Sequence, residues 1–273
     1  KIKGSGYDWR TLDTALALNQ PGVDLVLPLP VPKEEAEARI WPELVTATVQ
    51  HVSGRVSRFE IRPEGWDLPS IREGFLPFYE SGVWAIYGVS REMEVGGSGI
   101  SWDRIGIKRL ISYCRDKTLP LHFVSWQMES KGPTDLARSI SDVEGILDQY
   151  AMLDRPRLLV TGWHASSCSS NINKRSLGLS SLVSSLDLDV EAICLDLSRN
   201  EGTVDVLHAL DRLGRVRLPM TIQSPNGNLE GIASKDGDKV LALFWNLSED
   251  QVFPGTISIR GLPGGRKVRI QHF

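Results

Sequence analysis

The sequence lacks the features that would point to a nucleic-acid-binding or membrane protein. Its 31 Lys and Arg residues are offset by 34 Asp and Glu residues, which gives a formal net charge of −3 without a basic run. Nucleic acid and anionic membrane surfaces are therefore not expected partners. No apolar run approaches the ~20 residues that a membrane-spanning helix requires, so we expect no membrane span.

Cysteine is also scarce. Cys114, Cys168 and Cys194 are scattered and form no CxxC pair, so we expect neither a disulfide framework nor a structural zinc site. His164 and Cys168 stand four residues apart, but no third or fourth ligand accompanies them. The glycine run at 95–99 has neither the GxGxxG spacing nor a Lys-Ser/Thr partner. We therefore expect no metal and no cofactor.

Apolar runs alternate with helical patterns from Tyr7 to about Arg212. The clearest helix is expected at 134–150, where apolar residues recur at spacings of three and four. Strands separated by helical crossovers predict a parallel sheet of the α/β class. Six strands are expected, at 23–32, 57–62, 92–96, 121–126, 157–162 and 191–197.

Six strand units are two fewer than a closed (β/α)8 barrel of the TIM type contains. The sequence also begins without an initiator Met or a signal peptide, which indicates a processed or truncated piece. Three explanations of the count remain open at this point. Either the first two strands lie in a missing segment, or a partner chain supplies them, or the barrel has only six strands.

The pattern changes after about Gly214. Short apolar runs are separated there by turn signals such as Asn226-Gly227, Asp236-Gly237 and Gly264-Gly265. Such runs are typical of antiparallel strands joined by hairpin turns. We therefore predict a barrel domain over 1–214, followed by a small antiparallel β-sandwich domain over 215–273.

Several stretches in the same order resemble family 39 of the glycoside hydrolases, the β-xylosidase and α-L-iduronidase group of barrel clan A. That family has a fourth strand close to FEIWNEPN, followed by stretches close to KVGGP, FISWHTYS and ITEW. It also carries a trailing β-domain. The resemblance runs from about Tyr7 to the C-terminus. The corresponding stretches of this chain are FEIRPEGW (59–66), MEVGGSG (93–99), FVSWQMES (123–130), LVTGW (159–163) and DGDKVLALFWN (236–246).

The resemblance implies that one of the two catalytic carboxylates is absent. A retaining glycosidase uses a general acid/base and a nucleophilic carboxylate ~5–5.5 Å apart. Glu64 aligns with the acid/base, but the nucleophile aligns with Gly162. Gly162 could alternatively serve a backbone with positive φ at the end of its strand. Arg62 and Pro63 stand where the family has Trp and Asn, and Arg62 could pair with Glu64, which would keep that acid ionised.

Other positions around the expected mouth define a candidate substrate site. Gln127 and Glu129 replace the His and the aromatic residue of the family, whereas Trp126 and Trp163 are kept. These two Trp rings, and Trp66, could stack on sugars or pack at the rim. Together with Arg62 and Asp196, the residues Trp126, Gln127, Glu129 and Trp163 form the predicted substrate-binding set. We expect the remaining Trp residues to be core residues, namely Trp9, Trp41, Trp84, Trp102 and Trp245.

Three functions are compatible with these patterns. The first is a family-39-like barrel that binds a β-linked glycoside of the xyloside type, with hydrolysis lost or impaired at Gly162. The second is an active glycosidase that pairs Glu64 with a relocated carboxylate, Glu129 or Asp196, at the ~6.5–9.5 Å separation of inverting enzymes. The third is a structural or interaction module without a ligand. The accumulated polar changes favour the first.

Overall fold

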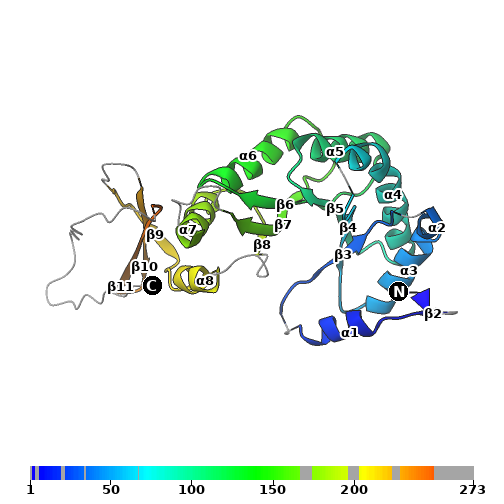
Figure 1. Cartoon of the computed structure of the whole chain (residues 1–273), viewed down its shortest axis with the longest axis horizontal. Helices are drawn as coiled ribbons and strands as arrows, with labels where there is room; N and C mark the ends of the chain where they lie inside the picture. Colours follow the sequence, from blue (N-terminus) through cyan, green and yellow to red (C-terminus); the bar gives the residue numbers. More distant parts are fainter. Residues whose placement is uncertain are drawn as a thin grey trace. The chain divides into compact units, whose positions relative to one another are not determined.

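The computed structural model describes residues 2–3, 6–19, 22–33, 35–66, 68–166, 174–195, 203–222 and 228–248 (Figure 1). The chain divides into two compact units. The first unit comprises Lys1–Met128, Ser139–Gly162 and Asp189–Cys194, and the second comprises Glu129–Arg138, Trp163–Leu188 and Leu195–Phe273.

A six-stranded sheet dominates the first unit. The strands follow one another in chain order, β3-β4-β5-β6-β7-β8, and each successive strand is reached through a helix. The registers of β3 with β4, β4 with β5 and β5 with β6 are parallel. The six expected strands are confirmed. Their bounds are Val26–Pro30, Arg58–Arg62, Glu94–Ser101, Phe123–Ser130, Arg157–Ala165 and Ala192–Leu195 for β3 to β8.

Helices α3, α4 and α5 lie on one side of this sheet (Figure 1). Their apolar faces form much of the core, since Val49 in α3, Val83 in α4 and Leu110 in α5 are fully buried. Helix α5 begins at the side chain of Asp103, which accepts hydrogen bonds from two backbone N–H groups of the first turn. The helices are α1 Arg10–Ala17, α2 Glu35–Ala38, α3 Trp41–Val52, α4 Leu68–Val89, α5 Arg104–Lys117, α6 Asp135–Leu147, α7 Lys174–Ser185 and α8 Thr203–Asp211.

Contacts between strands that are not neighbours show that the sheet is curled. The hydroxyl of Thr161 in β7 donates a hydrogen bond of 2.8 Å to Glu60 in β4, although β5 and β6 lie between these strands in the sheet order. Arg58 at the start of β4 pairs with Glu191 just before β8, at 2.8 Å. A parallel sheet that curls in this way without closing is a partial (β/α) barrel.

Both β5 and β7 carry an irregularity at their C-terminal halves. In β5, Ser98 pairs with Ser125 but Ile100 pairs with Trp126, so Gly99 is an extra residue, and its φ of 60° requires glycine. In β7, the bonded residues Arg157 and Ser166 are nine positions apart, whereas their partners in β6, His122 and Ser130, are eight apart. Each strand therefore contains one more residue than the neighbouring β6 along the paired stretch.

Strand β3 is an edge of the sheet as described, and its prolines lie on the outer side of that edge. Val31 donates its N–H to Arg62 of β4, and odd-numbered residues of β3 consequently point their N–H groups toward β4. Pro28 and Pro30 alternate with these residues, so their nitrogens face away from β4. Because proline has no N–H, the outer edge lacks a hydrogen-bond donor at both positions.

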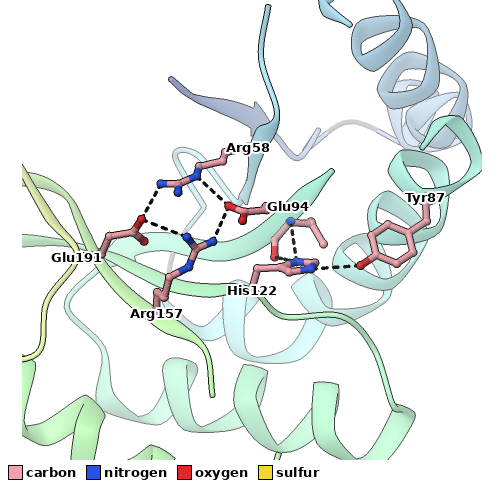
Figure 2. A network of polar contacts seen from close by, with 7 residues as sticks. Arg58, Tyr87, Glu94, His122, Arg157 and Glu191 are labelled. Carbon is pink, nitrogen blue, oxygen red and sulfur yellow. Dashed lines mark hydrogen bonds and ion pairs between the residues drawn. The ribbon is translucent and has the colours of Figure 1, made fainter. Parts of the chain in front are cut away.

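Four charged residues form a ring of ion pairs at the N-terminal ends of the strands (Figure 2). Arg58, Glu94 and Arg157 are the first residues of β4, β5 and β7, and Glu191 precedes β8. Arg58 lies 2.8 Å from both Glu94 and Glu191, and Arg157 contacts the same two carboxylates. The ring ties β4 to β8 at the end of the barrel opposite its mouth. Next to it, His122 bonds to the backbone of Val95 and to the hydroxyl of Tyr87.

We expect this ring to make the stability of the first unit depend on pH. Burial raises the pKa of Glu94, but the hydrogen bond from Arg157 and the charges of Arg157 and Arg58 lower it by more, so that its net pKa is below its ordinary value. A lowered folded-state pKa contributes stability that is present above the unfolded pKa of ~4.3 and is lost as the pH falls through the folded value. When the pH is lowered from 7 to 3, the free energy of unfolding should therefore fall by about 1 kcal/mol less in Glu94→Gln than in the unmodified chain. Urea unfolding at the two pH values measures this difference.

The matched control for this ring is Asp148→Asn, because the Asp148 carboxylate is 66% exposed in its pair with Arg155. Exposed pairs contribute little, so the control variant should follow the unmodified chain at both pH values. Equal pH dependence of all three proteins would show that the ring does not couple to folding.

The second unit contains α7, α8 and a three-stranded antiparallel sheet of order β11-β10-β9. Glu230 of β10 joins the sheet to α7, because its carboxylate accepts hydrogen bonds from Ser180 and from the indole of Trp245. The further strands expected near 256–260 and 267–273 lie outside the described residues. A sandwich and a boundary at residue 214 therefore remain predictions. The strands are β9 Val216–Leu218, β10 Leu229–Asp236 and β11 Lys239–Asn246, and the small β1 Ile2–Lys3 and β2 Gly6–Tyr7 pair with each other in the first unit.

The expectation that the remaining Trp residues are core residues was wrong for Trp84, and Trp9 and Trp102 are only partly buried. Trp41 and Trp245 are buried, with 2% and 6% of their surface exposed, as predicted. Trp84 is 48% exposed, because it lies on the outer side of α4 rather than on the side that faces the sheet. None of the helices in the described ranges is both long and apolar enough to cross a bilayer.

Candidate functional site

Three charged side chains lie at the C-terminal end of β4 and in the turn that follows it, namely Glu60, Arg62 and Glu64. Glu60 and Arg62 alternate with Phe59 and Ile61, which are fully buried, so the charged residues point to the opposite, inner face of the sheet. Arg62 lies between two carboxylates, since its guanidinium is 3.6 Å from Glu60 and 3.6 Å from Glu64. The pairing of Arg62 with Glu64 that the sequence suggested is therefore present.

Exposure differs sharply between the two carboxylates. The side chain of Glu64 is 62% exposed, whereas that of Glu60 is 2% exposed. Gly65 follows Glu64 with a φ of 69°, a left-handed turn that carries the chain away from the strand immediately after this acid. Solvent weakens the ion pair of Glu64 with Arg62, so this acid stays accessible to a ligand.

Glu60 is the one residue of this group that the sequence analysis missed. It accepts a hydrogen bond from Thr161, the residue directly before Gly162, and it lies against Gly99 of β5. A Cβ atom on Gly99 would be 2.6 Å from Cδ of Arg62 and 2.8 Å from the carboxyl carbon of Glu60. The signal was available, because Glu60 is a single acid in the middle of an otherwise apolar strand core.

Two polar atoms in this region, one in Arg62 and one in β5, have no hydrogen-bond partner within the described part of the chain. They are Nε of Arg62 and the hydroxyl of Ser98, and both are buried. The neighbouring hydroxyl of Ser125 in β6 is used, because it accepts the N–H of Gly99. Buried polar groups are normally paired, so Arg62 and Ser98 are groups that a hydroxyl-bearing ligand or water could satisfy.

Gly162 has an ordinary strand backbone. Positive φ angles occur at other glycines but not at Gly162, so the explanation of this glycine by a left-handed conformation is wrong. A Cβ atom built at residue 162 would lie 3.1 Å from Cγ of Gln127 in β6. The contact is with a flexible side chain, so the backbone at 162 could carry a larger residue after a small shift of Gln127.

The two Trp residues of the predicted substrate set are enclosed by protein. Trp126, in the first unit, is fully buried and donates its indole N–H to Ser139 of α6, at 3.3 Å. Trp163, in the second unit, is 1% exposed and donates to Ser130, at 2.8 Å. Trp66 meets Phe78 of α4 edge-on, with ring centroids 5.8 Å apart. These contacts support packing for all three rings.

The structure thus brings together Arg62 at the end of β4 and Glu64 in the following turn, and also Gln127 of β6 and Gly162 of β7. Glu129 is exposed and belongs to the second unit. Asp196 lies outside the described residues, as does Cys168. Among the residues that can be described, no group of three or more His, Cys, Asp or Glu side chains is arranged to hold a metal ion.

The mouth of the barrel carries the carboxylates of Glu60 and Glu64 and the guanidinium of Arg62, but no side chain at position 162. A glycosidase needs one carboxyl group that is protonated before it acts and a second that attacks the sugar or a water. Here one guanidinium, that of Arg62, lies 3.6 Å from the carboxylates of both Glu60 and Glu64. Position 162, on the strand that faces them, has no side chain. What remains is an arrangement of donors and acceptors that matches the hydroxyl groups of a sugar.

The fold is therefore a partial (β/α) barrel with polar residues at its mouth. No family model matches the sequence, and no curated protein matches it. Solved structures do match. A glucosidase from Croceicoccus marinus has a TM-score of 0.65 at 17% identity, over 85% of this chain and 59% of that protein.

Two further structures have the same fold. N2152 from Neocallimastix frontalis has a TM-score of 0.60 at 10% identity, over 84% of this chain and 64% of that one. A thermostable mutant of the xylanase Xyn10A from Cellvibrio japonicus has a TM-score of 0.54 at 10% identity, over 71% and 73%. This chain covers less than two thirds of the first two proteins. These likenesses show that the fold is a barrel of the kind found in glycosidases, without distinguishing family 39.

Proposed function

We propose that this chain is a family-39-like barrel that binds a β-linked glycoside of the xyloside type and has lost most or all of its hydrolytic activity. The observation that carries the proposal is Gly162. Its backbone is an ordinary strand at the mouth of the barrel, and it lacks the carboxylate that a retaining glycosidase would place there. Glu64 remains exposed in the turn after β4 as the candidate acid/base, beside Arg62.

The unpaired polar groups support binding of a hydroxyl-rich ligand. A sugar hydroxyl both accepts and donates, so one such group can accept from Nε of Arg62 and another can bond to Ser98. Gln127 adds an amide at the same strand ends. In this proposal Arg62, Gln127 and Glu64 contact the sugar, and the buried Trp126 supports the strand that carries Gln127.

The test is hydrolysis of a panel of activated aryl glycosides, with and without formate or azide. A small anion can occupy the space left by a missing carboxylate and attack the sugar in its place. We expect turnover of an aryl β-xyloside to rise at least about tenfold with the anion, and to be abolished in Glu64→Gln. Binding without anion should be visible by ligand-observed NMR.

Three results would each point elsewhere. Turnover without anion would favour an active enzyme with a relocated carboxylate, which removal of Glu129 or Asp196 would then identify. Binding without any turnover would leave a carbohydrate-binding barrel whose acid/base is also inactive. Neither binding nor turnover, for any glycoside in the panel, would overturn the proposal in favour of a structural module.

A further inference from the structure

A groove on the outer side of the first unit is unrelated to the barrel mouth. It runs between α3 and α4, has a volume of about 630 Å³ and is open to solvent. Glu43, Thr46 and Gln50 of α3 lie along it at spacings of three and four, so they share one face of that helix. Ser81 and Trp84 line it from α4.

Trp84 gives the groove an aromatic surface. The side chain is 48% exposed, and its aromatic neighbour Tyr87 meets it edge-on, with an angle of 80° between the rings and centroids 6.5 Å apart. The edge of Tyr87 therefore does not shield the whole ring. The small side chain of Ala47 on α3 leaves the ring room on the groove side. A half-exposed indole beside small residues is suited to stacking against a flat apolar surface.

The polar side chains of the groove are free to bind. Within the described residues, the carboxylate of Glu43 and the amide of Gln50 make no ion pair or hydrogen bond, and both residues are exposed. The hydroxyls of Thr46 and Ser81 donate to backbone carbonyls of their own helices, so their lone pairs can still accept. The lining contains one carboxylate and no Lys or Arg.

This combination selects the class of ligand. Without a cation, the groove does not suit a phosphate or an acidic chain. An amide, a carboxylate and two hydroxyls beside an aromatic face match a neutral sugar, whose ring has an apolar C–H face and a rim of hydroxyl groups. The volume lies within the ~300–1,000 Å³ of small-molecule sites. We propose that the α3–α4 groove is a second carbohydrate site, in which one unit of a neutral oligosaccharide stacks on Trp84.

The experiment is affinity electrophoresis of the whole chain in native gels containing soluble xylan, hydroxyethyl cellulose or a soluble β-1,3-glucan. We expect at least one polysaccharide to retard the chain. Trp84→Ala should weaken that retardation about tenfold in apparent affinity, because it removes the stacking surface. Gln50→Ala, which leaves the ring in place, should weaken it less. Leu153→Ala is the matched control, since Leu153 is 98% exposed and lies in the loop before β7.

The outcomes separate this site from the barrel mouth. Binding of an aryl β-xyloside, followed by ligand-observed NMR, reports the mouth and should be unchanged in Trp84→Ala. Loss of retardation with intact xyloside binding supports the groove even if the barrel proves inactive. Retardation that is equal in Trp84→Ala and in the unmodified chain, or absent in all three gels, overturns it. Self-association that depends on Trp84 in sedimentation would instead identify an interface between copies and also overturn it.

Discussion

Replacing Gly96 by Ala is expected to cost about 3 kcal/mol or more in unfolding free energy, which is large for a single methyl group. Gly96 lies in β5 directly beside β6. A Cβ atom there would be 2.3 Å from the carbonyl oxygen of Phe123 and 2.5 Å from its ring. The nearest atom belongs to the backbone of a paired strand, and Phe123 is fully buried, so neither can move without breaking the register.

The matched control is Gly88→Ala. Gly88 lies in α4, and a Cβ atom at that residue would meet nothing within 4 Å. Alanine is the better helix former, so this variant should gain about 0.5 kcal/mol. Urea unfolding of both variants measures the difference. Equal stabilities would mean that β5 and β6 are further apart than described.

Replacing Glu60 by Leu is expected to cost about 3 kcal/mol, because removal of one partner of a buried charged pair leaves the other uncompensated. The substitution takes away the acceptor of the Thr161 hydroxyl, which joins β4 to β7 across the interior. It also leaves Arg62 with only the exposed Glu64 as a carboxylate partner.

The conservative variant Glu60→Gln keeps an acceptor for Thr161 and a similar volume, so its cost should be about 1 kcal/mol. Thermal unfolding of the two variants at pH 7 distinguishes the losses. If Glu60→Leu is as stable as the unmodified chain, the buried carboxylate contributes nothing to the fold and its place beneath Arg62 must be explained by ligand binding.

Local periodicity was enough to predict most of the barrel. All six strands and the helix expected at 134–150 were predictable, because short apolar runs and an apolar spacing of three and four directly indicate buried segments. The pairing of Arg62 with Glu64 was also predicted from their spacing of two residues, although Glu64 lies in the turn after β4. Predictions that needed only neighbours in sequence were therefore confirmed.

Contacts across the interior could not be predicted in this way. The bond from Thr161 to Glu60 joins residues 101 positions apart, and it depends on the curl of the sheet and on extra residues in β5 and β7. The ion-pair ring around Arg157 is similar, since its members come from four different strand starts. The prediction that Trp84 is a core residue failed for another reason. Its spacing fits a helix face, but spacing alone does not say which face of α4 meets the sheet.

The prolines of β3 affect how readily molecules of this protein associate with one another through a strand edge. At an unpaired strand edge, a strand of a second molecule can form backbone hydrogen bonds and so extend the sheet. The outer edge of β3 offers carbonyl groups at Pro28 and Pro30 but no N–H group at either position, so a second molecule that extended the ladder would leave its own acceptors unsatisfied opposite these two residues. Concentrated samples are thereby protected, at this edge, against the ordered aggregation that open sheets invite.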